Sequence, residues 1–234
     1  MSDKHLLRKT RKGTIINASS KKQETDVIIA LKEVVDKINK NYPVELAHYS
    51  NWSLKDIVKK LREYFPKTEF HYYFESSNIR PDGGILFIKN KKGKLYPILI
   101  TEVKNQGTNV LRIKEGLKEQ ARGNAIERLG KNVIGLRTAM SPESIFPFVC
   151  FGFGCDFAEN SSILDRVVTI AMFGKLNKTY LHNEGDKVIF NRGSFYFRDE
   201  KWTVKEMVDI MYDIAERSIL YYFSAYGKND FLQS

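Results

Sequence analysis

Cysteine and histidine are scarce in this chain of 234 residues, which has 2 Cys and 4 His. Cys150 and Cys155 are too few for a disulfide framework, and a zinc site would need more ligands than the scattered histidines supply. We therefore expect two reduced thiols. No apolar run approaches the ~20 residues that a membrane span requires, and the basic N-terminus leads into no signal-peptide core. These absences predict a soluble intracellular protein.

Acidic residues are outnumbered, because Lys and Arg total 38 against 28 Asp and Glu, which gives a formal net charge of +10. A surplus of this size favours a polyanionic partner such as nucleic acid or an anionic membrane surface. A merely basic soluble protein is the alternative. Hydrophobic residues make up 42% of the chain and aromatic residues 12%, which suffices for a sizeable core. The length fits one domain.

The chain divides into a polar, basic N-terminal arm over residues 1–23 and a single domain over residues 24–234. We interpret the arm as disordered alone or ordered on a partner, with a solvated tail as the alternative. Apolar residues recur every three or four positions in four segments, which is typical of helices. The predicted helices span residues 24–40, 54–65, 127–140 and 203–223. Ser53 is a predicted cap of the second, and Thr203 with Glu206 fits a capping box before the last.

Short apolar or aromatic runs bounded by turn residues predict strands. They span residues 69–74, 85–88, 95–103, 146–151, 165–173 and 195–197. Residues 90–93 form a predicted hairpin tip between the second and third of these strands. The run over 95–103 is long and apolar enough to lie centrally in a sheet. We therefore expect an α/β fold with a central mixed β-sheet flanked by helices.

Three polar residues flank the predicted hairpin: Asp82 precedes its first strand, and Glu102 and Lys104 end its second. Neighbouring strands lie ~4.8 Å apart, so the start of one is close to the end of the other. Glu102 and Lys104 are two positions apart and point to the same face of the sheet. We therefore expect two carboxylates and an ammonium to converge. The alternative is a solvated turn and a surface ion pair.

This set of side chains suits the hydrolysis of a phosphodiester. Carboxylates can hold Mg²⁺, which polarises a phosphoryl oxygen and lowers the pKa of a bound water. Lys104 can orient or deprotonate the attacking water and stabilise charge growing on phosphorus. Gly83 and Gly84 are expected to let the backbone come close to a DNA strand. Asp82, Glu102 and Lys104 are thus candidate catalytic residues, with Asp82 and Glu102 as the metal ligands.

Three segments resemble the EcoRI-type restriction endonucleases, a family within the PD-(D/E)xK nucleases. Residues 76–85 (SSNIRPDGGI) resemble the family's first metal-acid segment, and residues 101–107 (TEVKNQG) resemble its Glu-x-Lys segment. Residues 123–128 (GNAIER) match its recognition segment at every position. Weaker similarity continues through residues 146–148 and 206–214. The resemblance therefore covers most of the chain from residue 76 onwards.

The resemblance implies a restriction-endonuclease-like fold and a homodimer that cuts a palindrome around a central AATT, leaving a four-base 5′ overhang. It implies that Asp82 and Glu102 bind Mg²⁺, with Lys104 beside the attacking water and Arg80 at the phosphate near the scissile bond. It also implies a cognate DNA methyltransferase and a place in the prokaryotic cytoplasm. The dimer interface stays open, with the C-terminal helix and the segment after Gly107 as candidates.

The recognition segment is a candidate for base contacts, and its members are Gly123, Asn124, Ala125, Ile126, Glu127 and Arg128. Asparagine pairs well with the adenine edge, Glu127 can accept from an exocyclic amino group, and Arg128 can donate to purine N7 or O6. We expect an extended chain over residues 123–126 along the major groove, followed by a helix. The alternative is an ordinary helix start that Asn124 caps.

Arg122 stands where the GAATTC-cutting members of the family carry alanine, and the CAATTG-cutting members resemble this chain in having arginine there. Guanine is the commonest specific partner of arginine, so we predict CAATTG over GAATTC, with bare AATT or degenerate outer bases still open. Arg166 weakly resembles another family arginine that approaches the DNA. The alternative for Arg166 is a surface position at a strand edge.

Two other functions stay open. A repair or junction-resolving nuclease could use the same metal site without sequence specificity, and it would smear a plasmid rather than give discrete fragments. A DNA-binding protein with an inert metal site would bind without cleaving in Mg²⁺. The presence of Asp82, Glu102 and Lys104 together argues against this second alternative.

Overall fold

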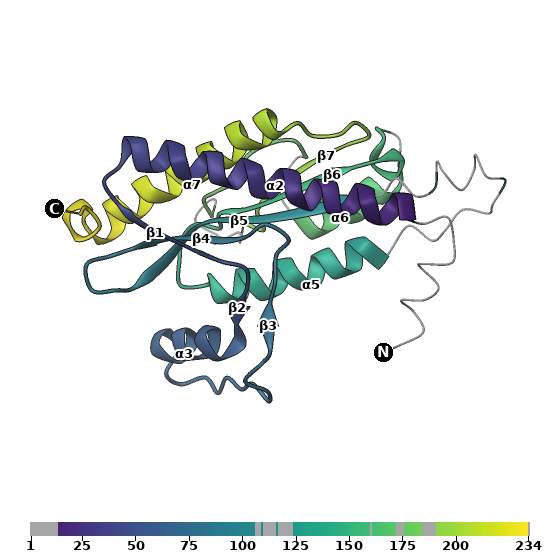
Figure 1. Ribbon diagram of the computed structural model, residues 1–234. Helices are drawn as coiled ribbons and strands as arrows, with labels where there is room; N and C mark the ends of the chain where they lie inside the picture. Colours follow the sequence, from purple (N-terminus) through teal and green to yellow (C-terminus); the bar gives the residue numbers. More distant parts are fainter. Residues whose placement is uncertain are drawn as a thin grey trace.

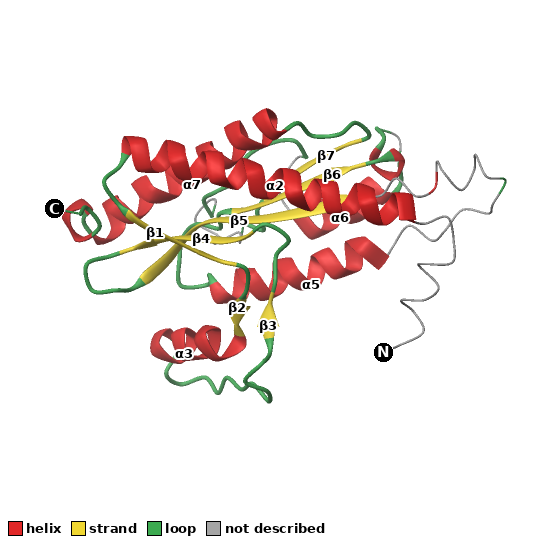
Figure 2. Cartoon of the chain, in the orientation of Figure 1, coloured by secondary structure: helices red, strands yellow, loops and turns green. Residues whose placement is uncertain are grey.

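A five-stranded mixed sheet forms the centre of the molecule in a computed structural model (Figure 2). The structure describes residues 14–105, 109, 116, 124–159, 161–171, 176–183 and 191–233. The strand order is β1–β4–β5–β6–β7, with the bounds Glu45–Tyr49, Gly84–Lys89, Leu95–Asn105, Phe148–Phe153 and Ser194–Arg198. The β1–β4 and β4–β5 pairs are antiparallel, and the β5–β6 and β6–β7 pairs are parallel. The predicted α/β class is confirmed.

Helices cover both faces of this sheet (Figure 1). They are α2 and α7 on one face and α5 and α6 on the other, with the bounds Thr14–Asn41, Val204–Tyr226, Asn124–Ala139 and Ile163–Ala171. Val103 and Phe151 of the central strands belong to the apolar cluster under α2 and α7. Ile100 and Phe148 belong to the cluster under α5 and α6. Burial on both faces explains why β5 is a continuous apolar run rather than an alternating one.

Helix α2 starts ten residues before the predicted boundary. Residues 14–23, which we assigned to the arm, are its first turns, so that part of the prediction was wrong. Polar residues dominate these turns. A helix can extend through such a stretch because, once the later turns have nucleated it, each added residue forms one more hydrogen bond. Residues 1–13 lie outside the described residues.

Helix α7 begins where the sequence predicts. The hydroxyl of Thr203 accepts from the main-chain N–H of Glu206 at 3.3 Å, and the Glu206 carboxylate accepts from the N–H of Thr203 at 2.9 Å. This reciprocal pair is the predicted capping box, which satisfies two N–H groups at the helix start.

A smaller unit lies between β1 and β4 in the chain and projects from the main body (Figure 1). Its elements are β2 (Trp52–Ser53), α3 (Leu54–Tyr64) and β3 (Asn78–Ile79). Ser53 caps α3 as predicted, because its hydroxyl accepts from Asp56 N at 3.0 Å. Residues 69–74 form no strand, so that prediction was wrong, and Tyr73 is 92% exposed. Aromatic residues favour strands only where they pack on neighbours.

Residues 165–171 belong to helix α6 and not to the predicted strand. Ile163 and Val167 are buried four positions apart, as one face of a helix requires, whereas Val168 is exposed. The β-branched residues here favoured a strand in the sequence, but a short apolar run does not distinguish the two structures by period.

Both cysteines are free thiols, as predicted, with Cys150 buried and Cys155 half-buried. Among the described residues, the structure contains no helix with the length and apolarity that a membrane crossing needs.

Candidate active site

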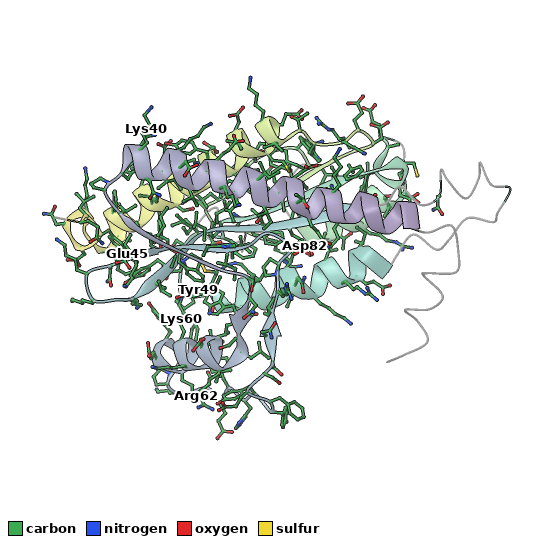
Figure 3. The ribbon with its side chains drawn as sticks, viewed as in Figure 1. Lys40, Glu45, Tyr49, Lys60, Arg62 and Asp82 are labelled. Atoms are coloured by element: carbon green, nitrogen blue, oxygen red, sulfur yellow. The ribbon has the colours of Figure 1, made fainter. Side chains whose placement is uncertain are left out.

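A tight turn places Asp82 beside the end of strand β5. The N–H of Gly84 donates to the carbonyl of Pro81 at 3.1 Å, which closes the turn, and the N–H of Gly83 donates to the carbonyl of Thr101 at 3.0 Å. Strand β4 then pairs with β5 from the Gly84–Thr101 register onwards. The start of β4 and the end of β5 therefore meet at one edge, where Figure 3 labels Asp82.

The two glycines of this turn are required by contacts within the protein. A Cβ atom at Gly83 would lie 1.9 Å from Thr101 Oγ1. At Gly84, where φ is +77°, a Cβ atom would lie 2.5 Å from His48 Nε2. We expected these glycines to admit a DNA strand, whereas the structure gives an internal reason: the turn packs directly on β5 and β1. His48 also hydrogen bonds with the carbonyl of Gly83 at 3.0 Å, which fixes the turn from the side of β1.

Asp82, Glu102 and Lys104 converge as the sequence predicts. Lys104 Nζ lies 3.2 Å from Asp82 Oδ2 and donates to Glu102 Oε1 as well. Glu102 is also bonded to the main chain of the turn, and Asp82 to the main chain of strand β5. Asp82 N donates to Glu102 Oε2 at 3.1 Å, and Val103 N donates to Asp82 Oδ2 at 3.2 Å. Each carboxylate is therefore held in place by more than one hydrogen bond.

Burial sets the electrostatics of the three groups. The Glu102 side chain is 1% exposed, that of Lys104 16% and that of Asp82 30%. Desolvation raises the pKa of Glu102, although the nearby Lys104 ammonium opposes the shift. Burial by itself lowers the pKa of Lys104, but the Glu102 and Asp82 carboxylates outweigh it, and the pKa is raised. The lysine is therefore held as an ammonium.

The oxygen atoms around Lys104 fit a hard divalent cation. Asp82 Oδ2, Glu102 Oε1 and the carbonyl oxygen of Val103, which is 3.1 Å away, all accept from the ammonium. Mg²⁺ prefers such oxygen donors and keeps several waters. The described residues include no group of three or more His, Cys, Asp and Glu side chains that could hold a metal ion. An ion bound by Asp82 and Glu102 would therefore complete its shell from water, the Val103 carbonyl or the substrate.

Helix α5 contacts the acidic pair directly. Asn132 Nδ2 lies 3.4 Å from Glu102 Oε1, so α5 and β5 are joined by a polar contact at the candidate active site. Asn132 is eight positions after Asn124, the first residue of α5. The helix that carries the recognition segment at its start therefore reaches the candidate metal ligand two turns later.

The structure places only part of the recognition segment. Arg122 and Gly123 lie outside the described residues. The helix starts at Asn124, so the expected extended chain was wrong for residues 124–126. Glu127 and Arg128 are exposed in the first turns of α5, where they are open to a partner. Ile126 is 2% exposed and belongs to the apolar cluster under α5, so its side chain faces the core.

The two outlying arginines are both exposed. Arg80 directly precedes the turn that carries Asp82, and Arg166 lies on helix α6 rather than at the expected strand edge. Arg80 is therefore only two residues from Asp82, whereas Arg166 lies on a different element from the three candidate catalytic residues.

Comparison with known proteins gives the family. The family model described as restriction endonuclease EcoRI matches residues 9–163 and 158–229, which together span most of the chain. The chain belongs to the EcoRI restriction endonuclease family. The type II restriction enzyme RsrI of Cereibacter sphaeroides is 30% identical to it, over 88% of this chain and 87% of the relative. The type II restriction enzyme EcoRI of Escherichia coli is 28% identical, over 80% and 81%.

Membership of the EcoRI family makes the chain an enzyme, a type II site-specific deoxyribonuclease. Enzymes of this kind act on DNA, generally as dimers, and generally depend on a divalent metal ion. A site that gathers two carboxylates and an ammonium at one sheet edge is consistent with that chemistry.

Sequence analysis missed two residues that contact the candidate active site, His48 and Asn132. His48 contacts a residue 35 positions away and Asn132 one 30 positions away. Neither lies in a motif. His48 reaches the site because β1 pairs with β4, and Asn132 reaches it because α5 packs on the sheet. The one available signal was the helical period after residue 126, which puts Asn132 near the buried face of α5.

Proposed function

We propose that this enzyme hydrolyses duplex DNA in the presence of Mg²⁺ at a palindrome with an AATT core, leaving four-base 5′ overhangs with 5′-phosphates. The observation that carries the proposal is the convergence of Asp82, Glu102 and Lys104 at the sheet edge that helix α5 contacts through Asn132. The recognition segment at the start of that helix is then linked to the chemistry by a rigid element.

Asp82 and Glu102 hold the metal ion in this proposal. When bound, Mg²⁺ polarises a phosphoryl oxygen and lowers the pKa of a water molecule. The backbone bonds from Asp82 N and Val103 N orient the two carboxylates in advance, which reduces the reorganisation needed on binding. Lys104 orients the attacking water and stabilises negative charge as it grows on phosphorus.

The start of α5 reads the bases. Asn124 pairs with adenine, Glu127 accepts from an exocyclic amino group, and Arg128 donates to a purine edge. The exposure of Glu127 and Arg128 supports this assignment. We leave the side chain of Ile126 out of the interface, because it is buried. Arg80 and Arg166, both exposed, contact phosphates.

Arg122 reads the outer base pair. A guanidinium donates two hydrogen bonds to O6 and N7 of guanine, so we propose CAATTG in preference to GAATTC. Bare AATT and sites with degenerate outer bases are the other outcomes of the test below.

The enzyme acts as a homodimer in the prokaryotic cytoplasm, beside a methyltransferase that protects the host's own sites. A palindrome requires two copies related by a two-fold axis. Exposed Ile134 on α5 and Val168 on α6, 58% and 43% exposed, lie on neighbouring helices and supply apolar surface for such an interface.

Sequencing the ends of a plasmid cut in Mg²⁺ tests activity, specificity and overhang together. We expect discrete fragments whose ends carry AATT overhangs and derive from CAATTG. Fragments from GAATTC alone would contradict the assignment of Arg122. A smear would favour the non-specific nuclease, and intact plasmid that the protein still binds would favour the inert DNA-binding protein.

A further inference from the structure

The ammonium of Lys104 lies among the same oxygen atoms that are candidate ligands of a divalent cation. Its Nζ atom is 3.2 Å from Asp82 Oδ2 and 3.1 Å from the carbonyl oxygen of Val103, and it also donates to Glu102 Oε1. Hard cations such as Mg²⁺ take carboxylate and carbonyl oxygens of this kind. The lysine and a metal ion would therefore compete for one set of oxygens.

The donors of Lys104 are fully engaged in this arrangement. An ammonium carries three N–H donors and no acceptor, and Nζ is surrounded by three acceptors, one for each N–H group. The proposed function needs Lys104 to donate to the attacking water or to the phosphate. At least one of its bonds to the protein must therefore break before Lys104 can act on the substrate.

The two acids have further hydrogen bonds that do not involve Lys104. Glu102 accepts from the N–H of Asp82 at 3.1 Å and lies 3.4 Å from Asn132 Nδ2, and Asp82 accepts from the N–H of Val103 at 3.2 Å. These bonds can hold both carboxylates in place when the lysine leaves. Neighbouring carboxylates repel each other, however, and Glu102 is buried, so another cation must then replace the ammonium.

We propose that Lys104 is an exchangeable cation of the candidate active site. It neutralises Asp82 and Glu102 in the metal-free enzyme, releases their oxygens when a divalent ion binds, and is then free to donate to water and phosphate. The inference rests on the proposed function, because it takes these two acids as the metal ligands. Its consequence is weak metal binding in the absence of DNA, since only the fraction of molecules with a displaced lysine can bind the ion.

Titration of the DNA-free enzyme with Mn²⁺, which takes the same oxygen ligands as Mg²⁺, tests the exchange by calorimetry. We expect Lys104→Met to bind Mn²⁺ at least about tenfold more tightly than the wild type, because no internal cation has to be displaced. Lys92→Met, at the exposed hairpin tip far from the acids along β4 and β5, is the matched control and should bind like the wild type. Equal or weaker binding by Lys104→Met, or no binding to either protein, would contradict the proposal.

A measurement on the wild type does not depend on whether Lys104→Met folds. The Lys104 side chain is 16% exposed and is held by three acceptors, so an amine reagent such as acetic anhydride should label it slowly. Saturating Mg²⁺ should raise this labelling rate at least about threefold, because it shifts the population towards the displaced lysine. Exposed Lys67 is the internal control and should be labelled at one rate throughout. A Lys104 rate that Mg²⁺ leaves unchanged or lowers would contradict the exchange.

Both readouts are made without DNA, so they distinguish this inference from the proposed function. If the wild type cuts duplex DNA in Mg²⁺ but Lys104→Met and the wild type bind Mn²⁺ equally well, the exchange alone is wrong. If Lys104→Met binds Mn²⁺ more tightly but the wild type cuts no DNA, the proposed function alone is wrong.

Discussion

Gly83 sets how closely the turn that carries Asp82 can approach strand β5. In Gly83→Ala the new Cβ atom would meet Thr101 Oγ1 at 1.9 Å, and Thr101 is 1% exposed and cannot retreat. We expect a loss of about 1–3 kcal/mol in the free energy of unfolding, together with weaker cleavage because Asp82 is displaced. Urea denaturation and a cleavage assay measure the two effects.

A matched glycine is available as a control. At Gly130, inside helix α5, an added Cβ atom meets Ile170 at an ordinary 3.5 Å, so Gly130→Ala should stabilise the protein by roughly 0.5–1 kcal/mol. If Gly83→Ala were as stable and as active as the wild type, the close approach of the turn would not be a constraint on the site.

Lys104 is predicted to act on the reaction rather than on DNA affinity. Lys104→Met keeps the length of the side chain but removes the ammonium that contacts both carboxylates. We expect single-turnover cleavage to slow by at least about 100-fold, because a preorganised charge at the reacting phosphate is lost. DNA affinity should change little. The same change at Lys92, exposed on the hairpin tip, serves as the comparison, and cleavage by Lys104→Met within threefold of it would refute the assignment.

The sequence allowed prediction of the central residues of the site but not of their supports. Asp82, Glu102 and Lys104 lie on one hairpin, so strand pairing and side-chain alternation suffice to bring them together. His48 and Asn132 depend on the packing of β1 and α5, which no local pattern encodes. The two glycines were recognised as special, but the reason for them, contact with Thr101 and His48, needed the structure.

At the scale of elements, Asn132 is the contact through which helix α5 meets the acids. Asn132→Ala removes a 3.4 Å hydrogen bond to Glu102 Oε1. That bond is long, and Lys104 also pairs with this oxygen, so we expect cleavage to slow only about three- to tenfold, in line with one hydrogen bond. Asn132→Asp should be worse, since it adds a third carboxylate beside Glu102. A faster single-turnover rate for Asn132→Asp than for Asn132→Ala would contradict this account.

The cap of helix α7 makes a prediction about acid stability. The hydrogen bond from Arg198, then those from Thr203, lower the pKa of Glu206 from 4.5 to about 2. A carboxyl with a depressed pKa stabilises the fold above its ordinary pKa and loses that effect as the pH falls through its folded value. Glu206→Gln should therefore cost about 1 kcal/mol at pH 7, a modest amount because the carboxylate is partly exposed, and less as the pH falls from 4.5 towards 2.

Urea midpoints at pH 7 and pH 3 check this prediction. Glu200→Gln, at an exposed position six residues earlier, is the control and should have no effect at either pH. A Glu206→Gln deficit that stays constant or grows on acidification would show that the capping box does not act through the charge.

Elements with a clear apolar period could be predicted, and those without one could not. The helix over Leu54–Tyr64 was predicted because Ile57, Val58 and Leu61 form its buried face after a serine cap. Residues 165–171 were mistaken for a strand because their β-branched side chains favour strands. In the structure they form a helix whose Val167 is buried in the apolar cluster under α5 and α6. The start of α2 was missed because its first turns are polar, and tertiary context rather than local pattern sets where it begins.

At the scale of the whole molecule, the candidate catalytic side chains lie on one face of the sheet, and the described residues of the helices on the other face do not contribute to the candidate active site. Helices α2 and α7 cover one face of the sheet, and α5 and α6 cover the other (Figure 1). The side chains of Glu102 and Lys104 lie on the α5–α6 face, because they follow Ile100 at steps of two residues and Asn132 of α5 contacts Glu102. The hairpin with the candidate catalytic residues and helix α5 thus lie on one side of the sheet, where Asn132 contacts Glu102. A duplex that contacts the start of α5 can reach the acids without crossing the α2–α7 layer.

Single-turnover cleavage of one duplex by the wild type and by Glu102→Gln tests the central claim most directly. Affinity for the same duplex is measured in Ca²⁺, a divalent ion also bound through oxygen ligands. Glu102→Gln keeps the shape of the buried side chain but removes the charge that holds the metal. We predict that Mg²⁺-dependent cleavage falls by at least about 100-fold while affinity for DNA is largely kept. Cleavage by Glu102→Gln at the wild-type rate would contradict the account.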